Sequence, residues 1–111
     1  MTEVRFDLTG HLSLWSWCIK NPSKEKSEWP GWKRNGGKYE DQPFDCFACG
    51  YDAQFEGPRC ASCPLTGRDE KRRCLGGLVR WYKTSLGLSY DRALFAELIR
   101  DLPVRPGVKC K

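Results

Sequence analysis

The stretch Cys46-Phe47-Ala48-Cys49-Gly50, followed by Cys60-Ala61-Ser62-Cys63-Pro64, contains two C-x2-C pairs with ten residues between them. Two residues between cysteines allow a tight turn to direct both sulfurs at one point, and Gly50 permits the positive φ that such a turn often needs. Four thiolates fill the tetrahedral coordination of zinc, so the ion would be structural and not catalytic. The predicted cofactor is therefore a structural Zn²⁺ bound by Cys46, Cys49, Cys60 and Cys63.

Three alternatives to this ligand set stay open. Cys74 follows Cys63 by the same gap that separates Cys49 from Cys60, so it could replace Cys60 or Cys63 as the fourth ligand. Four cysteines can also hold an iron–sulfur cluster, and buried cysteines can simply be small hydrophobic residues of a core. The two tight pairs favour zinc because each pair arranges its sulfurs locally.

Helices are predicted near both ends of the chain. Residues 9–20 begin at a possible cap, Thr9, and stop before Pro22, and they place Leu12, Trp15 and Ile19 on one apolar stripe. Residues 89–102 combine the cap Ser89 with a broad apolar face before Pro103; this face contains Leu94, Phe95, Leu98, Ile99 and Leu102. A further helix is expected over residues 75–86, where apolar residues recur at helical spacing.

The connecting segments complete the predicted architecture. Residues 51–55 followed by a turn at 56–58 would form a hairpin that returns the chain to the metal. Residues 21–45 are rich in Pro and Gly, so we expect loops there, with one helical turn near 23–26. The predicted fold is α+β: one zinc-stabilised domain over 1–111, in which a zinc-knuckle hairpin (46–63) packs with the N- and C-terminal helices. A tryptophan-rich loop closes its core, and residues 104–111 form an irregular tail.

Composition narrows the class of protein. The 111 residues carry a net charge of +5, which permits nucleic acid as a partner without requiring it. No apolar run approaches the roughly 20 residues of a membrane helix, and the first residues do not resemble a secretory signal. Seven cysteines cannot all pair in disulfides within the chain. We therefore expect a cytoplasmic protein that does not engage a membrane and is a monomer or small homo-oligomer.

Catalytic patterns are missing from the sequence. His11 is its only histidine, and we expect it to be a surface or helix-capping residue. Zinc hydrolases and deaminases need histidine ligands, an open metal position and a nearby Glu, and a cysteine nucleophile needs a histidine to activate it. The sequence therefore predicts a protein without enzymatic activity.

Aromatic and basic residues are the candidates for partner contact. Four tryptophans lie between residues 15 and 32, lysines lie among them, Lys33 and Arg34 follow directly, and a second basic group begins at Arg68. This combination is typical of single-strand binding and of protein–protein hot spots. Acidic neighbours dilute both groups and favour a solvated face or a mixed-charge protein interface. The predicted contact residues are Trp29, Trp32, Lys33, Arg34, Arg68, Lys71, Arg72 and Arg73.

The overall pattern resembles small cysteine-rich proteins of tailed phages and prophages. The resemblance rests on Leu14-Trp15-Ser16-Trp17, Lys26-Ser27-Glu28-Trp29-Pro30-Gly31-Trp32, the two C-x2-C pairs, Cys74 and the closing helix. At least one zinc-containing protein of this sort is a type II anti-CRISPR that binds the effector nuclease and blocks DNA loading. The resemblance implies an inhibitor of a host defence protein, with a type II CRISPR effector nuclease as the expected partner in the bacterial host cell. The alternative is a nucleic-acid-binding zinc-ribbon module of phage origin.

Overall fold

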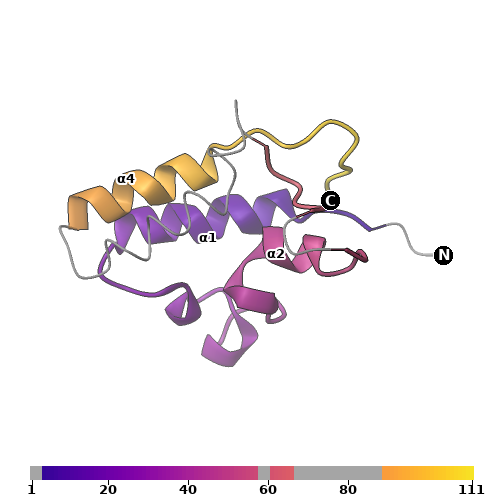
Figure 1. The fold of residues 1–111 in the computed structure, drawn as a ribbon. Helices are drawn as coiled ribbons and strands as arrows, with labels where there is room; N and C mark the ends of the chain where they lie inside the picture. Colours follow the sequence, from indigo (N-terminus) through magenta and orange to yellow (C-terminus); the bar gives the residue numbers. More distant parts are fainter. Residues whose placement is uncertain (1–3, 58–60, 67–88) are drawn as a thin grey trace.

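The computed structural model describes residues 4–57, 61–66 and 89–111, and within them the chain is helical. The α-helices of this described part are α1 (Leu8–Lys20), α2 (Phe47–Asp52) and α4 (Ser89–Arg100) (Figure 1). Three short 3₁₀ turns lie between α1 and α2, namely η1 (Lys26–Glu28), η2 (Lys33–Asn35) and η3 (Pro43–Asp45). The helix expected over residues 75–86 lies outside the described residues.

The predicted α+β class and its zinc-knuckle hairpin are wrong. Extended pairing in the described residues is limited to isolated β-bridges, and the expected first arm of the hairpin contains the end of α2. Cys46 is extended and precedes α2, whereas Cys49 lies inside it. The two cysteines of a C-x2-C pair are three positions apart, which is close to the 3.6 residues of one helical turn. The buried pair Phe47 and Tyr51 stands at i and i+4, and this apolar spacing favours the helix over a hairpin arm.

The N-terminal helix was predicted correctly, but its cap was not. Asp7, not Thr9, caps α1: its carboxylate accepts a hydrogen bond from the Gly10 N–H at 2.9 Å. A carboxylate at this end also interacts favourably with the helix dipole. At the other end, the Asn21 backbone N–H and side-chain amide both donate to the Trp17 carbonyl at 2.9 Å, immediately before Pro22.

The buried face of α1 differs from the predicted stripe. Trp15 is fully buried, but Leu12 is 39% exposed. The positions that the structure buries follow i, i+3, i+4 and i+7, namely His11, Leu14, Trp15 and Cys18. Gly10 extends this face, since a Cβ atom there would lie 2.6 Å from the ring of Phe47. The missing side chain therefore allows α2 to approach α1 closely.

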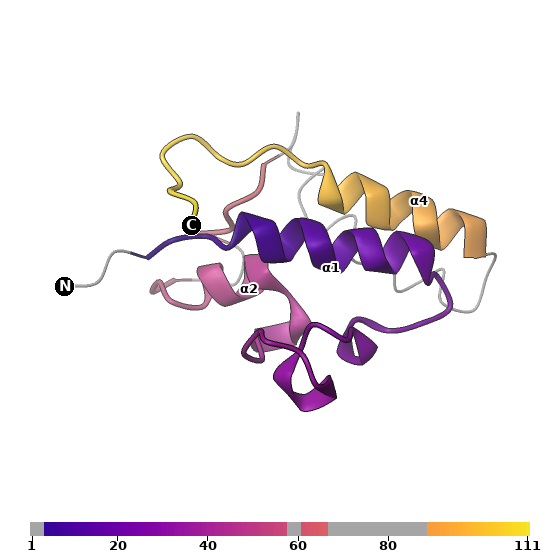
Figure 2. The same ribbon diagram turned by 180° about the vertical axis from the view of Figure 1, so that it is seen from behind.

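Helix α4 runs antiparallel to α1, which lies between α4 and the side occupied by α2 (Figures 1 and 2). Its first half is fixed by Arg92, whose guanidinium is 2% exposed. One terminal nitrogen donates to the carbonyls of Pro22 and Lys24 at 2.9 and 3.2 Å, and the other donates to both carboxylate oxygens of Glu25 at 2.9 and 3.0 Å. Arg92 thus ties α4 to the segment that follows α1.

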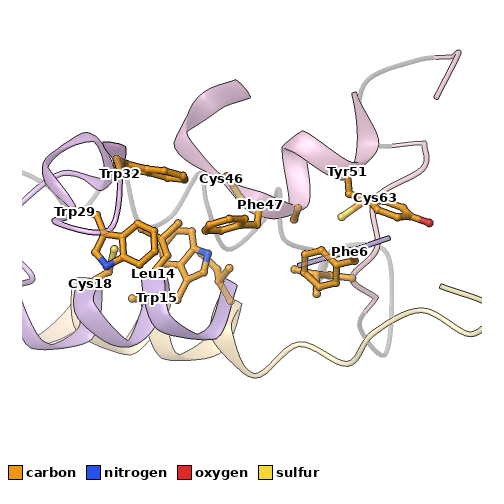
Figure 3. Close-up of a cluster of buried hydrophobic side chains, with 14 residues drawn as sticks. Phe6, Leu14, Trp15, Cys18, Trp29, Trp32, Cys46, Phe47, Tyr51 and Cys63 are labelled. Atoms are coloured by element: carbon orange, nitrogen blue, oxygen red, sulfur yellow. The ribbon is translucent and has the colours of Figure 1, made fainter. Parts of the chain in front are cut away.

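Residues 21–45, which we call the tryptophan lobe, project from the helices in both views (Figures 1 and 2). Trp29 and Trp32 are buried and turn inward, so the expectation that this loop closes the core is confirmed. Trp32 stacks on Phe47 with 5.2 Å between ring centroids, and Trp29 meets Trp32 edge to face at 5.0 Å. Figure 3 shows these rings beside Leu14, Trp15 and Cys18 of α1.

The C-terminal tail is irregular, as predicted, but it is attached to the rest of the structure. Phe6 forms a parallel bridge with Cys110, and Leu65 forms an antiparallel bridge with Val104. The bridge between Phe6 and Cys110 holds the two ends of the described chain together at the N-terminal end of α1 (Figure 1). No helix in the described ranges is long and apolar enough to span a membrane.

Candidate functional site

The predicted zinc ligands lie in two separate elements. Cys46 and Cys49 belong to the start of α2, whereas Cys63 lies in the segment 61–66, and Cys60 is outside the described residues. Cys46 is fully buried and Cys63 is 8% exposed (Figure 3). Among residues 4–57, 61–66 and 89–111, no three His, Cys, Asp or Glu side chains are arranged to hold a metal ion.

The described residues therefore do not form a zinc site by themselves, and we derive no function from a metal. Zinc at Cys46, Cys49, Cys60 and Cys63 stays a prediction, as does replacement of a ligand by Cys74, which is also outside the described residues. Metal analysis of the purified chain, with Cys49→Ser as the comparison, tests it directly: a tetrathiolate site predicts about one zinc per chain, lost in the variant.

Two further cysteines have different surroundings. Cys18 is fully buried, as expected for a core residue, and burial raises the pKa of its thiol to about 12. A thiol with so high a pKa is not a nucleophile at neutral pH. Cys110 is half-buried at its bridge with Phe6, in contact with the edge of the core.

His11 is the largest departure from the predicted site chemistry. It is fully buried, not on the surface, and within the described part of the chain neither ring nitrogen has a hydrogen-bond partner. Its ring packs against Phe6 with 5.4 Å between centroids, and burial lowers the pKa of the imidazole. A neutral imidazole inside the core cannot reach a substrate. Its position three and four residues before Leu14 and Trp15 is the sequence signal that could have placed it on the buried face.

The tryptophans chosen as contact residues face the core. Trp29 is 6% exposed and Trp32 is fully buried. The indole N–H of Trp32 donates to the Lys26 carbonyl at 2.9 Å, which uses its polar atom internally. Lys26 itself is 2% exposed, with its ammonium 5.7 Å from the ring centroid of Trp15. These aromatic residues stabilise the lobe and do not offer rings to a partner.

Lys33 and Arg34 are the described contact candidates that reach the surface. Lys33 forms an ion pair with Glu40, and Arg34 pairs with Asp45 and lies 3.8 Å from Asp41. The guanidinium of Arg34 also lies over the Trp32 ring, 5.8 Å from its centroid. The outer face of the lobe therefore displays cations and anions side by side.

Charge is unevenly distributed along the sequence. The tryptophan lobe contains five basic and five acidic residues, so it is electrically neutral. Residues 67–88 contain six basic and two acidic residues, a net charge of +4. The predicted contact residues Arg68, Lys71, Arg72 and Arg73 belong to this second segment and lie outside the described residues.

In the described residues, four large apolar side chains are exposed, three of which the sequence placed on buried helix faces. Leu94 and Leu98 are 44% and 52% exposed on the outer side of α4, and Leu12 and Phe55 are about 40% exposed. Of the predicted apolar face of the C-terminal helix, Ile99 is buried and Phe95 and Leu102 pack against the core, as expected. Leu94 and Leu98 face outward, and Arg92 and Ala96 are buried instead. Exposed single leucines are common on protein surfaces, so these residues do not by themselves define a site.

Comparison of the chain with protein-family models, with curated proteins and with solved structures finds no match.

Proposed function

We propose that this protein is a non-enzymatic, phage-type inhibitor that binds a host defence protein. The specific candidate is a type II CRISPR effector nuclease in complex with its guide RNA, whose DNA loading the inhibitor would block. This candidate partner is suggested by the resemblance of the sequence to small cysteine-rich phage proteins. An inhibitor of this kind would act in the bacterial cytoplasm.

The observation that carries the proposal is the mixed-charge outer face of the tryptophan lobe. Lys33 and Arg34 are already bonded to carboxylates, and the lobe has no net charge. A phosphate backbone gains affinity from unneutralised cations, through the release of counterions. Paired charges of both signs instead suit a protein surface, where they set orientation and specificity. The burial of His11 is consistent with a binding role, because the chain has no other histidine.

A nucleic-acid-binding module is the second candidate, and one observation favours it. Residues 67–88 carry a net charge of +4 and include Trp81 and Tyr82. Cations that bind phosphates together with aromatic rings that stack on bases are the usual means of holding single strands. In this alternative the basic segment, not the neutral lobe, would make the contact.

The test is a pull-down with the tagged protein from bacterial lysate that contains a type II effector nuclease and its guide RNA. The sample is divided, and one half is treated with nuclease before washing. Recovery of the effector in a stoichiometric amount in both halves supports the inhibitor. Recovery of nucleic acid alone, or of proteins that are lost after nuclease treatment, supports the second candidate and contradicts the first.

A further inference from the structure

The outer edge of the tryptophan lobe is built from two backbone segments held in register. Trp32 and Tyr39 form a parallel bridge, in which the Lys33 N–H donates to the Tyr39 carbonyl at 2.8 Å and the Tyr39 N–H donates to the Gly31 carbonyl at 2.9 Å. Trp32 is buried, whereas Lys33, the first residue of η2, is exposed and has Glu40 beside it.

This edge is fixed before any partner arrives. The Asn35 side-chain amide donates to the carbonyls of Ser27 and Trp29, both at 2.8 Å, and the Gly37 N–H donates to the Trp32 carbonyl at 2.9 Å. A Cβ atom at Gly37 would lie 2.2 Å from the Gly31 carbonyl oxygen, so the turn accepts no side chain there. A pre-ordered loop loses little conformational entropy on binding, and compact surface loops of this kind are frequently functional.

The charges on the edge stabilise the lobe only weakly. In the pair between Lys33 and Glu40 the side chains are 57% and 73% exposed, and exposed pairs contribute little to stability. Asp45, the acceptor for Arg34, has a φ of 53°, which is uncommon for a residue other than glycine. The exposed Lys33–Glu40 pair thus adds little to stability, and its two charges can exchange partners with an incoming surface at low cost.

We propose that the outer edge of the tryptophan lobe, residues 33–41 with Asp45, is the surface that binds the protein partner. This inference rests on the proposed function and adds to it the surface and the chemistry of the partner. The partner is a folded protein that presents both a carboxylate opposite Lys33 and a cation opposite Glu40. Lys33 and Arg34 are paired with acidic residues, and the third cation of this edge, Lys38, lies over the Tyr39 ring. The edge therefore suits a surface of mixed charge better than a polyanion.

A charge-exchanged double variant tests the proposal. Lys33→Glu combined with Glu40→Lys keeps the net charge and the internal ion pair, but reverses the pattern that a partner meets. The matched control exchanges a pair on α4, outside the lobe, by Glu97→Arg with Arg100→Glu; these side chains are 54% and 29% exposed. The lobe exchange is expected to melt close to the wild type, and the α4 exchange slightly below it, because Arg100→Glu also removes the exposed pair with Asp101.

The readout is inhibition of DNA cleavage by a purified type II effector nuclease loaded with guide RNA, measured over a series of inhibitor concentrations. We expect the lobe exchange to raise the half-inhibitory concentration about tenfold or more, since like charges then face each other, and the α4 exchange to leave it unchanged. Inhibition by the lobe variant at wild-type concentrations would overturn this inference and leave the proposed function standing. Failure of the wild type to bind or inhibit the complex would overturn both.

Discussion

Replacing Arg92 with alanine should test how α4 is fixed to the rest of the fold. Its guanidinium makes four hydrogen bonds at 2.9–3.2 Å while 2% exposed. Breaking a buried ion pair costs about 3–5 kcal/mol. Glu25 is 47% exposed and can be rehydrated, so we expect the lower end, about 3 kcal/mol. For a domain of this size that free energy lowers the melting temperature by about 12 °C.

The assay is urea denaturation followed by far-UV circular dichroism, with thermal melting as a second measurement. Arg100→Ala on the same helix is the control, because its pairs with Glu97 and Asp101 lie at the surface and should contribute less than about 1 kcal/mol. If Arg92→Ala were no more destabilising than Arg100→Ala, the reasoning from burial and hydrogen bonding would be refuted.

Three further predictions follow from the core. Gly10→Ala should destabilise the protein by about 1–3 kcal/mol in the same assay, because the new methyl group would overlap the Phe47 ring, and an unchanged midpoint would contradict the packing. Burial lowers the folded-state pKa of His11 below 6.5, so its contribution to the free energy of unfolding should be fully present above pH 6.5 and lost as the pH falls below that value. Urea midpoints measured between pH 5 and 8 should show this decline in the wild type, and His11→Gln should flatten it. An alkylating reagent should modify Cys110 before Cys18 in the native protein, as followed by peptide mass spectrometry; equal rates would contradict the burial of Cys18.

The two long helices could be predicted from sequence because each combines apolar periodicity with end signals. Prolines mark the ends of both, and α4 begins at the serine chosen as its cap, Ser89. Which face turns inward was harder to predict. The packing of α1 depends on two buried residues, Gly10 and His11. Gly10 has no side chain and His11 is polar, so neither contributes to an apolar pattern.

The middle of the chain could not be derived from local sequence. The spacing of Cys46 and Cys49 fits a metal knuckle and a helical turn equally well, and the contacts of Phe47 with the lobe and α1 favour the helix. Clustered tryptophans fit both a core and a binding surface. Only the tertiary arrangement shows that Trp32 is inside the lobe and that Lys33, its neighbour, is outside.

The central claim is that this protein recognises a protein surface, and the most direct test is the salt dependence of its affinity. The labelled protein is titrated with the purified type II effector–guide complex at about 50 and 200 mM salt, and the Kd is measured by fluorescence anisotropy. A mixed-charge protein interface predicts a change of less than about tenfold over this range. A loss of about a thousandfold, as expected when about six phosphates are neutralised, would contradict the claim and identify a nucleic-acid-binding module.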